Sequence, residues 1–171
     1  MACIAASAAA TQLPDLKASA VPTAIFHGLG DACIYPGMEH FTKQISEGTG
    51  AYAKCIEIGN GTESSFFMNM EKQVEKACEE INKNSNFDGE FNVAGLSQGG
   101  LVARYITESC VMKGKVRQFL SIGGPQMGVS DVPGCFNGTL CRGINYVVRK
   151  IAYFKEVQNL FGPAGYFRSP R

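Results

Sequence analysis

Short apolar runs alternate with longer amphipathic segments after Val21, and this alternation predicts the class of fold. Buried strands are expected at residues 23–26, 54–58, 91–96 and 116–122, and helices at 37–47, 64–83, 98–112 and, for the most part, 139–161. Alternation of strand and helix implies an α/β fold, in which helices flank a parallel sheet. Ligands of such sheets bind beyond the carboxyl ends of the strands, so the segments after Phe26, Leu96 and Ile122 are the candidate site.

The clearest helical pattern lies in residues 64–83. Apolar side chains recur there at steps of three and four residues, namely at Phe66, Phe67, Met70, Val74, Ala77, Cys78 and Ile81. Charged residues, mostly Glu and Lys, occupy the opposite face. A stripe of this kind favours packing against the core over a ligand-binding role.

Composition places the chain among globular proteins and excludes some partners. Its 171 residues are 45% apolar and 18% charged, which is typical of one domain with a hydrophobic core. The net charge of +1, from 16 basic and 15 acidic residues, gives no strong field to hold nucleic acid or an anionic membrane. No apolar run approaches the ~18 residues of a transmembrane helix.

Cysteines and glycosylation motifs indicate an oxidising compartment. Seven cysteines are many for a cytosolic domain of this size. There is no C-x-x-C pair, and His27 and His40 are the only histidines, so we expect no metal and no cofactor. The N-x-T motifs at Asn60 and Asn137 are candidate glycosylation sites and point to the secretory route.

The N-terminal residues 1–20 have two interpretations. Residues 3–10 form a short apolar run, and Ala18-Ser19-Ala20 is an A-x-A cleavage pattern at a suitable distance, as in a signal peptide. The stretch before the apolar run carries no basic residue, which favours a disordered alanine-rich leader instead. Cleavage would remove Cys3 and leave six cysteines, an even number.

The motif that most strongly indicates a catalytic function is Gly95-Leu96-Ser97-Gln98-Gly99, a G-x-S-x-G sequence followed by Gly100. An apolar strand precedes it and a helical run follows, as in the tight elbow that presents a nucleophilic serine at a helix N-terminus. The alternative is an ordinary glycine-rich turn between strand and helix. In this context we interpret Ser97 as the nucleophile.

A nucleophilic serine needs donors for the oxyanion of its tetrahedral intermediate. One is the backbone N–H of Gln98, and the other is expected in the His27-Gly28-Leu29-Gly30-Asp31 loop, where the N–H of Leu29 is the natural donor. His27 is then expected to position this loop. Its alternative role as general base is disfavoured because the base normally follows the serine in this fold.

With these motifs the sequence resembles the palmitoyl-protein thioesterases, lysosomal α/β-hydrolases that remove fatty acyl groups from cysteine. The likeness runs from about Thr23 to about Arg168. It is carried in chain order by the segments HGLGD (27–31), EIG (57–59), SFF (65–67), GLSQGG (95–100), SIGG (121–124) and Gly128-Val129. The resemblance implies that Ser97 is the nucleophile and that Leu29 and Gln98 are the oxyanion donors.

The same resemblance implies a set of disulfides. Two pairs carry over by position, Cys78 with Cys110 and Cys135 with Cys141. The family has two adjacent cysteines after the first strand, whereas this chain has Cys33 followed by Ile34, so Cys55 is the candidate partner of Cys33. Buried free thiols are the alternative for all three pairs.

The chain departs from the family after Ser97. The family continues with a catalytic Asp and then a His, but here no histidine follows His40, and Asp131 does not match the catalytic Asp. We therefore expect residues 21–171 to be a partial α/β-hydrolase domain without the C-terminal strands. Such a chain should be nearly inactive alone, with an open sheet edge after Ile122 and a tendency to aggregate.

Three functional hypotheses follow. The first is hydrolysis of long-chain acyl thioesters of S-acylated proteins or peptides, in the lysosome or secretory pathway. The second is a lipase or carboxylesterase of the same fold, since the same motifs serve both. The third is a non-catalytic acyl-binding chain, which the unmatched Asp and His favour.

Overall fold

The computed structural model describes residues 20–131 and 146–169 of the chain. Its centre is a parallel sheet of four strands in the order β2-β1-β3-β4. The strands are β1 (Thr23–Phe26), β2 (Ala53–Cys55), β3 (Glu90–Leu96) and β4 (Lys115–Ile122). The structure therefore confirms the predicted α/β class, and β1 and β3 lie in the middle of the sheet.

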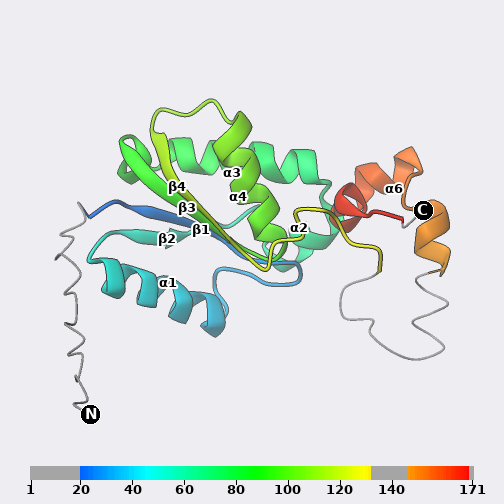
Figure 1. Cartoon of the computed structure of the whole chain (residues 1–171), viewed down its shortest axis with the longest axis horizontal. Coiled ribbons are helices and arrows are strands. Elements are labelled where there is room, and N and C mark those ends of the chain that lie inside the picture. The colour runs from blue at the N-terminus through cyan, green and yellow to red at the C-terminus, as the bar shows by residue number, and fades with distance from the viewer. Residues whose placement is uncertain (1–19, 132–145, 170–171) are drawn as a thin grey trace, which may run out of the picture.

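Helices cover the two faces of the sheet unequally (Figure 1). Helix α1 (Pro36–Thr49) lies on one face, where Met38 packs with Ile25 and Ala94. Helices α3 (Met70–Lys83) and α4 (Gln98–Ser109) lie on the other face, over a larger apolar cluster. The chain thus leaves β1 toward one face and β3 toward the other, so the connections change sides between these two strands, which is where sheets of this kind bind ligands.

Two predicted elements differ from the observed ones. The strand expected at 54–58 ends at Cys55, because the chain turns away from β1 after the N–H of Ile56 donates to the carbonyl of Ile25. The helix expected over 64–83 is interrupted, giving α2 (Thr62–Phe67) before α3. The interruption lies at Asn69, whose side chain accepts from the N–H of Lys72 and caps α3.

The C-terminal segment packs beside α2 and α3 (Figure 1). It contains a helical turn over residues 146–151, helix α6 (Lys155–Leu160) and the 3-10 helix η2 (Gly162–Tyr166). A second 3-10 helix, η1 (Ser85–Phe87), precedes β3. The helix expected over 139–161 is thus broken at residues 152–154, and 139–145 lie outside the described residues. An isolated bridge between Val129 and Phe167 holds this segment to the chain that follows β4.

The described residues contain two disulfides, Cys33–Cys55 and Cys78–Cys110, with Cα–Cα separations of 5.5 and 5.9 Å. The first ties the loop after β1 to the end of β2, and the second ties α3 to the end of α4. Both match the expected pairs. Cys3, the Cys135–Cys141 pair and the Asn137 motif lie outside the described residues, as does the 1–20 leader except for Ala20.

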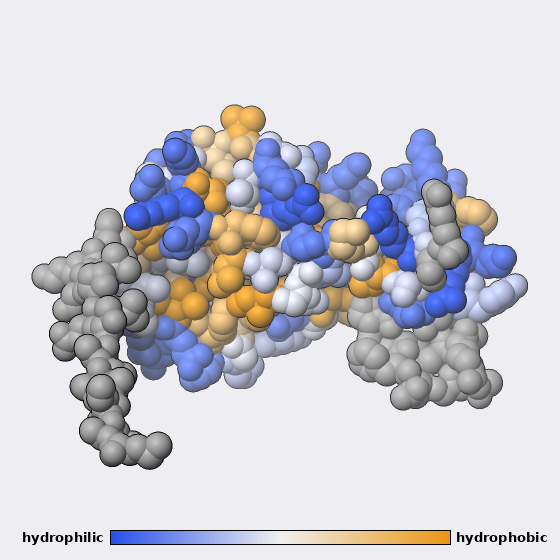
Figure 2. Space-filling model, viewed as in Figure 1, coloured by the Kyte–Doolittle hydropathy of each residue, from blue (hydrophilic) through white to orange (hydrophobic). Residues whose placement is uncertain are grey.

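Strand β4 is the edge of the sheet next to β3, and much of its apolar surface is uncovered. Phe119, Leu120 and Ile122 are 38%, 50% and 40% exposed. Figure 2 shows apolar surface across the middle of the viewed face, where Figure 1 places β4. The open edge expected from the sequence is therefore present in the described part of the chain.

Candidate active site

Ser97 stands between β3 and α4 in a strained backbone conformation. Its φ of 50° and ψ of −121° make it the one non-glycine residue with positive φ in the described ranges. Its N–H donates to the carbonyl of Ile122 over 2.8 Å, which fixes the turn to the end of β4. The residue is exposed, so the turn presents the hydroxyl to solvent. Strain of this kind gathers at functional sites.

Glycines on both sides of Ser97 make this turn feasible. A Cβ on Gly95 would overlap the backbone of Gly99, and a Cβ on Gly99 would overlap the carbonyls of Phe26 and His27. The start of α4 therefore packs directly on β3 and on the end of β1. This is the geometry of the strand–turn–helix elbow that the sequence motif predicts.

The loop after β1 lies against the serine. A Cβ on Gly28 would stand 3.2 Å from Ser97 Cβ and 3.8 Å from Ser97 Oγ. The next N–H along the chain is that of Leu29, and the N–H that follows Ser97 is that of Gln98. Within the part of the chain that the structure describes, neither N–H donates to an acceptor. Both N–H groups are thus without an acceptor in these residues.

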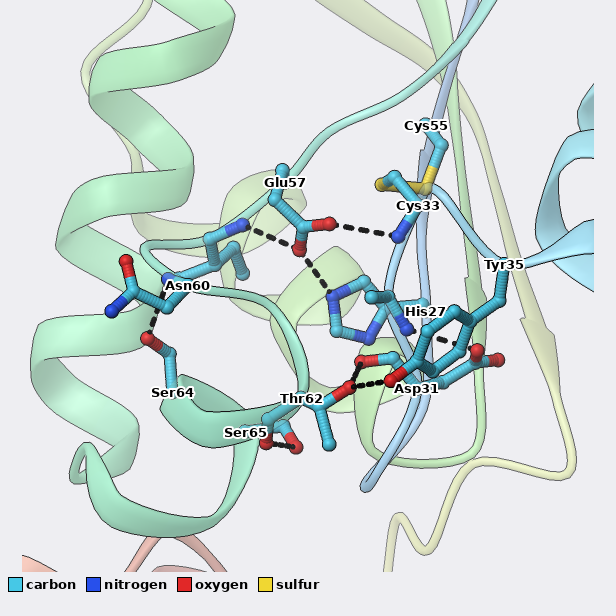
Figure 3. Close-up of polar contacts among 12 residues, drawn as sticks. His27, Asp31, Cys33, Tyr35, Cys55, Glu57, Asn60, Thr62, Ser64 and Ser65 are labelled. Carbon is cyan, nitrogen blue, oxygen red and sulfur yellow. Dashed lines mark hydrogen bonds and ion pairs between the residues drawn. A yellow bond between two sulfur atoms is a disulfide. The ribbon is translucent and has the colours of Figure 1, made fainter.

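Glu57 is the anchor of this loop, and sequence reasoning did not identify it. Its Oε1 lies 2.8 Å from His27 Nε2, and its Oε2 accepts from the N–H of Cys33 over 2.8 Å (Figure 3). One carboxylate therefore holds both ends of the 27–33 loop. Ser65 holds the middle, because its Oγ accepts from the N–H of Gly30 over 2.9 Å. The only hint in the sequence was the place of both residues in the EIG and SFF segments.

The side chain of Gln98 is fixed by a buried polar network. Its Nε2 donates to Ser65 O and to Gln73 Oε1, each over 3.0 Å. Its Oε1 accepts from the hydroxyl of Tyr166 over 2.8 Å. Burial raises the pKa of Tyr166 well above its usual range, so this hydroxyl stays a donor. Through Tyr166, the C-terminal segment holds the residue that follows Ser97.

An apolar cavity of about 420 Å³ opens beside the loop. Leu29 and Phe66 line one side, and Val148, Ile151, Leu160 and Phe167 are among the residues that line the other. The apolar stripe of residues 64–83 is thus divided. Val74, Ala77 and Ile81 are buried as predicted, but Phe66 lines the cavity and Phe67 is 65% exposed. The prediction of core packing was wrong for these two because Asn69 separates α2 from α3.

No side chain in residues 20–131 and 146–169 forms a hydrogen bond with the Ser97 hydroxyl. The ring nitrogens of His27 face Gly28 O and Glu57, and His40 is exposed on α1. Asp131 is paired with Arg149 over 2.7 Å. The described residues therefore place the loop after β1 against Ser97 and the cavity beside that loop, and none of their side chains contacts the serine hydroxyl as a general base would.

One group of metal-ligating side chains occurs in the described residues, formed by His27, Cys33 and Glu57. These are the residues through which Glu57 anchors the 27–33 loop. Cys33 is held in a disulfide, so the sulfur is not a thiolate ligand in this state.

The fold and the elbow define the class of protein, an α/β protein of the hydrolase type. The family model for palmitoyl protein thioesterase matches residues 22–171, and the chain belongs to this family.

Three curated relatives have similar sequences. Palmitoyl-protein thioesterase 1 of Caenorhabditis elegans is 27% identical over 157 residues, which cover 88% of this chain and 52% of the relative. Palmitoyl-protein thioesterase 3 of Dictyostelium discoideum is 28% identical over 151 residues, with 87% and 50% covered. The palmitoyl-protein thioesterase-dolichyl pyrophosphate phosphatase fusion 1 of Schizosaccharomyces pombe is 24% identical over 163 residues, with 92% and 26% covered. The chain thus spans about half the length of the first two relatives and a quarter of the third.

Proposed function

We propose that this chain carries the nucleophile, the oxyanion donors and an acyl-binding cavity of a hydrolase that removes long-chain acyl groups from cysteine thioesters. The observation that supports this most is the position of the cavity. Its wall includes Leu29, the residue that follows Gly28, and Gly28 lies against Ser97. Burial of methylene groups would favour binding of a long alkyl chain in this cavity by about 0.8 kcal/mol each. Because Leu29 borders both the cavity and the loop that packs on Ser97, the carbonyl of such a chain is expected near the serine.

The chemistry begins with attack of Ser97 Oγ on the thioester carbonyl. A C–O bond forms, and the carbonyl oxygen gains a negative charge that the N–H groups of Leu29 and Gln98 stabilise. The C–S bond then breaks, and the thiol leaves with the proton from the serine. Because a thiol has a pKa near ~8.5, it leaves without strong acid assistance. Water finally hydrolyses the acyl-serine, a step that needs a general base.

A second candidate function is acyl binding without turnover. It is favoured by the absence of a hydrogen-bonded base at Ser97 within the described ranges. Loss of the histidine of a serine triad costs roughly 10⁶ in kcat. We therefore expect that any turnover by this chain alone is slow, and that the acylation step is the one to measure.

The test is to trap the acyl-serine. The 171-residue chain is incubated with a palmitoyl thioester and digested, and the peptide that carries Ser97 is examined by mass spectrometry. The proposal expects one added palmitoyl group at Ser97, and none in Ser97→Ala. Saturable binding with no acylation of either form would support the non-catalytic alternative. Equal acylation from a palmitoyl oxygen ester would favour a lipase or carboxylesterase.

A matched pair of variants tests whether the cavity binds the acyl chain. Val148 lines the cavity, whereas its neighbour Val147 is 52% exposed and does not. A Val148→Trp substitution should fill the cavity and lower acylation by a palmitoyl thioester, but spare acylation by an acetyl thioester. Val147→Trp should leave both unchanged. Equal effects of the two substitutions would contradict the assignment of the cavity to the acyl chain.

We also propose a secretory or lysosomal location. The two disulfides favour an oxidising compartment, and Asn60 of the first N-x-T motif is exposed in a turn. In the described residues no helix is long and apolar enough to cross a bilayer. Sensitivity of the expressed protein to an asparagine-specific glycosidase, lost in Asn60→Gln combined with Asn137→Gln, is the test of this route.

A further inference from the structure

Ser65 contacts both segments that carry the proposed oxyanion donors. This residue of α2 is buried, with 3% of its surface exposed. Its hydroxyl oxygen accepts from the N–H of Gly30 over 2.9 Å, and its carbonyl accepts from Nε2 of Gln98 over 3.0 Å. Gly30 follows Leu29 in the loop after β1, and Gln98 follows Ser97. One buried residue thus links the loop after β1 to the start of α4.

The hydroxyl of Ser65 is oriented for its bond to Gly30. It donates to the carbonyl of Thr62 over 2.7 Å, so its hydrogen points into α2 and its lone pairs are left for the N–H of Gly30 (Figure 3). Gly30 has a φ of 76°, in a region that glycine adopts without strain. Because glycine allows many backbone conformations, this hydrogen bond helps to fix the backbone next to Leu29.

The carbonyl of Ser65 is available to Gln98 because α2 is short. The helix ends at Phe67, so the N–H four residues after Ser65 lies beyond it. The carbonyl accepts instead from the side-chain amide of Gln98, and the other groups of that amide bond to Gln73 and Tyr166. Gln98 is 2% exposed, so its whole side chain is fixed in the interior.

We propose that Ser65 is a positioning residue that holds the N–H groups of Leu29 and Gln98 at a fixed separation and so sets the geometry of the oxyanion site. The inference rests on the proposed thioester chemistry. Donors of this kind stabilise a charge that develops only in the transition state, and a misplacement of about 1 Å can cost about 10²-fold in rate. Loss of the Ser65 hydroxyl should therefore slow acylation of Ser97 and leave binding of the acyl chain unchanged.

Ser64, the preceding residue, is a matched control. It is also buried, at 8% exposed, and its Oγ accepts from the backbone N–H of Asn60 over 2.8 Å. Ser64→Ala and Ser65→Ala each remove one hydroxyl of α2 and its bond to a backbone N–H. Only the bond of Ser65 belongs to the loop that packs on Ser97. A purely structural role of Ser65 would therefore give the two variants similar effects.

The experiment measures acylation of Ser97 in a single turnover by the whole chain. The chain is mixed with palmitoyl thioester at several concentrations, all in excess, and acylated Ser97 is followed in time by mass spectrometry. Ser65→Ala should lower the limiting rate by about tenfold to a hundredfold and leave the half-saturating concentration unchanged. Ser64→Ala should keep the limiting rate of the unaltered chain. Urea unfolding followed by circular dichroism shows whether each variant is folded under the assay conditions.

A pair of ligands separates the oxyanion from the acyl chain. A long-chain trifluoromethyl ketone adds to Ser97: the bond from Oγ to the carbonyl carbon forms, the C=O π electrons move to oxygen, and the serine proton passes to solvent. The alcohol of equal chain length binds through its chain alone. Ser65→Ala should weaken binding of the ketone by about tenfold or more and leave the alcohol unchanged. If Ser65→Ala does not fold, Ser65→Cys replaces it, because a thiol fills the place but accepts hydrogen bonds weakly, and the same direction is expected.

The outcomes separate this inference from the function on which it rests. If the unaltered chain is neither acylated nor binds the ketone more tightly than the alcohol, the proposed function and the inference are both overturned. If the unaltered chain is acylated, but Ser64→Ala and Ser65→Ala have equal limiting rates, the inference alone is overturned. Equal weakening of the ketone and the alcohol in Ser65→Ala would also overturn it, because the hydroxyl would then support the cavity and not the oxyanion site.

Discussion

Strands β3 and β4 are neighbours in one sheet and similar in apolar content, yet they differ in burial. In β3, Phe91 and Val93 are 0% and 1% exposed, whereas Phe119 and Leu120 of β4 are 38% and 50% exposed. The apolar pattern alone does not distinguish them. The place of the strand in the sheet does, because β3 pairs on both sides and β4 pairs with β3 alone in the described residues.

The difference bears on where the site lies. The elbow follows β3, whose faces are packed on both sides, and its strained turn is held by the surrounding backbone. An edge strand offers no such support and leaves N–H and C=O groups free to pair with another chain. The candidate nucleophile thus follows the buried strand β3, whereas the edge strand β4 is the one that could pair with another chain.

The largest expected effect comes from crowding the elbow after β3. Gly99→Ala places a methyl group on the carbonyls of Phe26 and His27, so we expect it to cost about 4 kcal/mol or more of unfolding free energy. Urea unfolding followed by circular dichroism measures this. Gly37→Ala is the control, because open space surrounds that glycine of α1, and a gain of up to about 1 kcal/mol is expected. Similar losses of unfolding free energy in the two variants would refute the explanation by close contact at Gly99.

The next effect compares the two strands directly. Phe91→Ala should cost about 3 to 5 kcal/mol, since it empties a fully buried site. Phe119→Ala, on the same face of the neighbouring strand, should cost about 1 kcal/mol because that ring is already partly in water. Midpoints of urea unfolding give both values. Equal losses of unfolding free energy in the two variants would mean that another part of the protein or a second chain covers β4 in solution.

A smaller effect is expected where the C-terminal segment holds the first residue of α4. Tyr166→Phe leaves Gln98 Oε1 without its donor and should cost about 1 to 2 kcal/mol near neutral pH. Burial raises the pKa of Tyr166 in the folded chain, so the unfolded chain releases this proton first, near pH ~10. The advantage of Tyr over Phe is therefore full below about pH 10 and shrinks as the pH rises further. Unfolding curves at pH 7 and about pH 11 test this, with the exposed Tyr105→Phe as the unaffected control.

The smallest effect on stability is expected at the edge itself. Leu120→Lys should change the unfolding free energy by no more than about 0.5 kcal/mol, because this side chain is half exposed. It should nevertheless reduce self-association, since a charge on an edge strand opposes pairing with another chain. Sedimentation velocity at increasing concentration measures the association. A stability loss close to that of Phe91→Ala would mean that Leu120 is buried by a partner.

The sequence predicted the centre of the molecule better than its periphery. Thr23–Phe26 and the elbow around Ser97 could be predicted because short apolar runs, glycines and chain order act locally there. Glu57 could not be identified, since its role depends on β1 and β2 being neighbours in space. Phe66 was assigned to the core because periodicity does not reveal that Asn69 ends one helix and starts another. The cavity depends on contacts between residues about ninety positions apart, which no local pattern encodes.

The hydrogen bond from the N–H of Ser97 to the carbonyl of Ile122 has a mechanical consequence. It joins the elbow to the last residue of the edge strand, backbone to backbone, without an intervening side chain. A displacement of β4 relative to β3, for example by a strand that docks on the edge, would therefore act on the backbone of Ser97. The conformation of Ser97, and with it the position of its hydroxyl, is therefore coupled to the position of the edge strand β4.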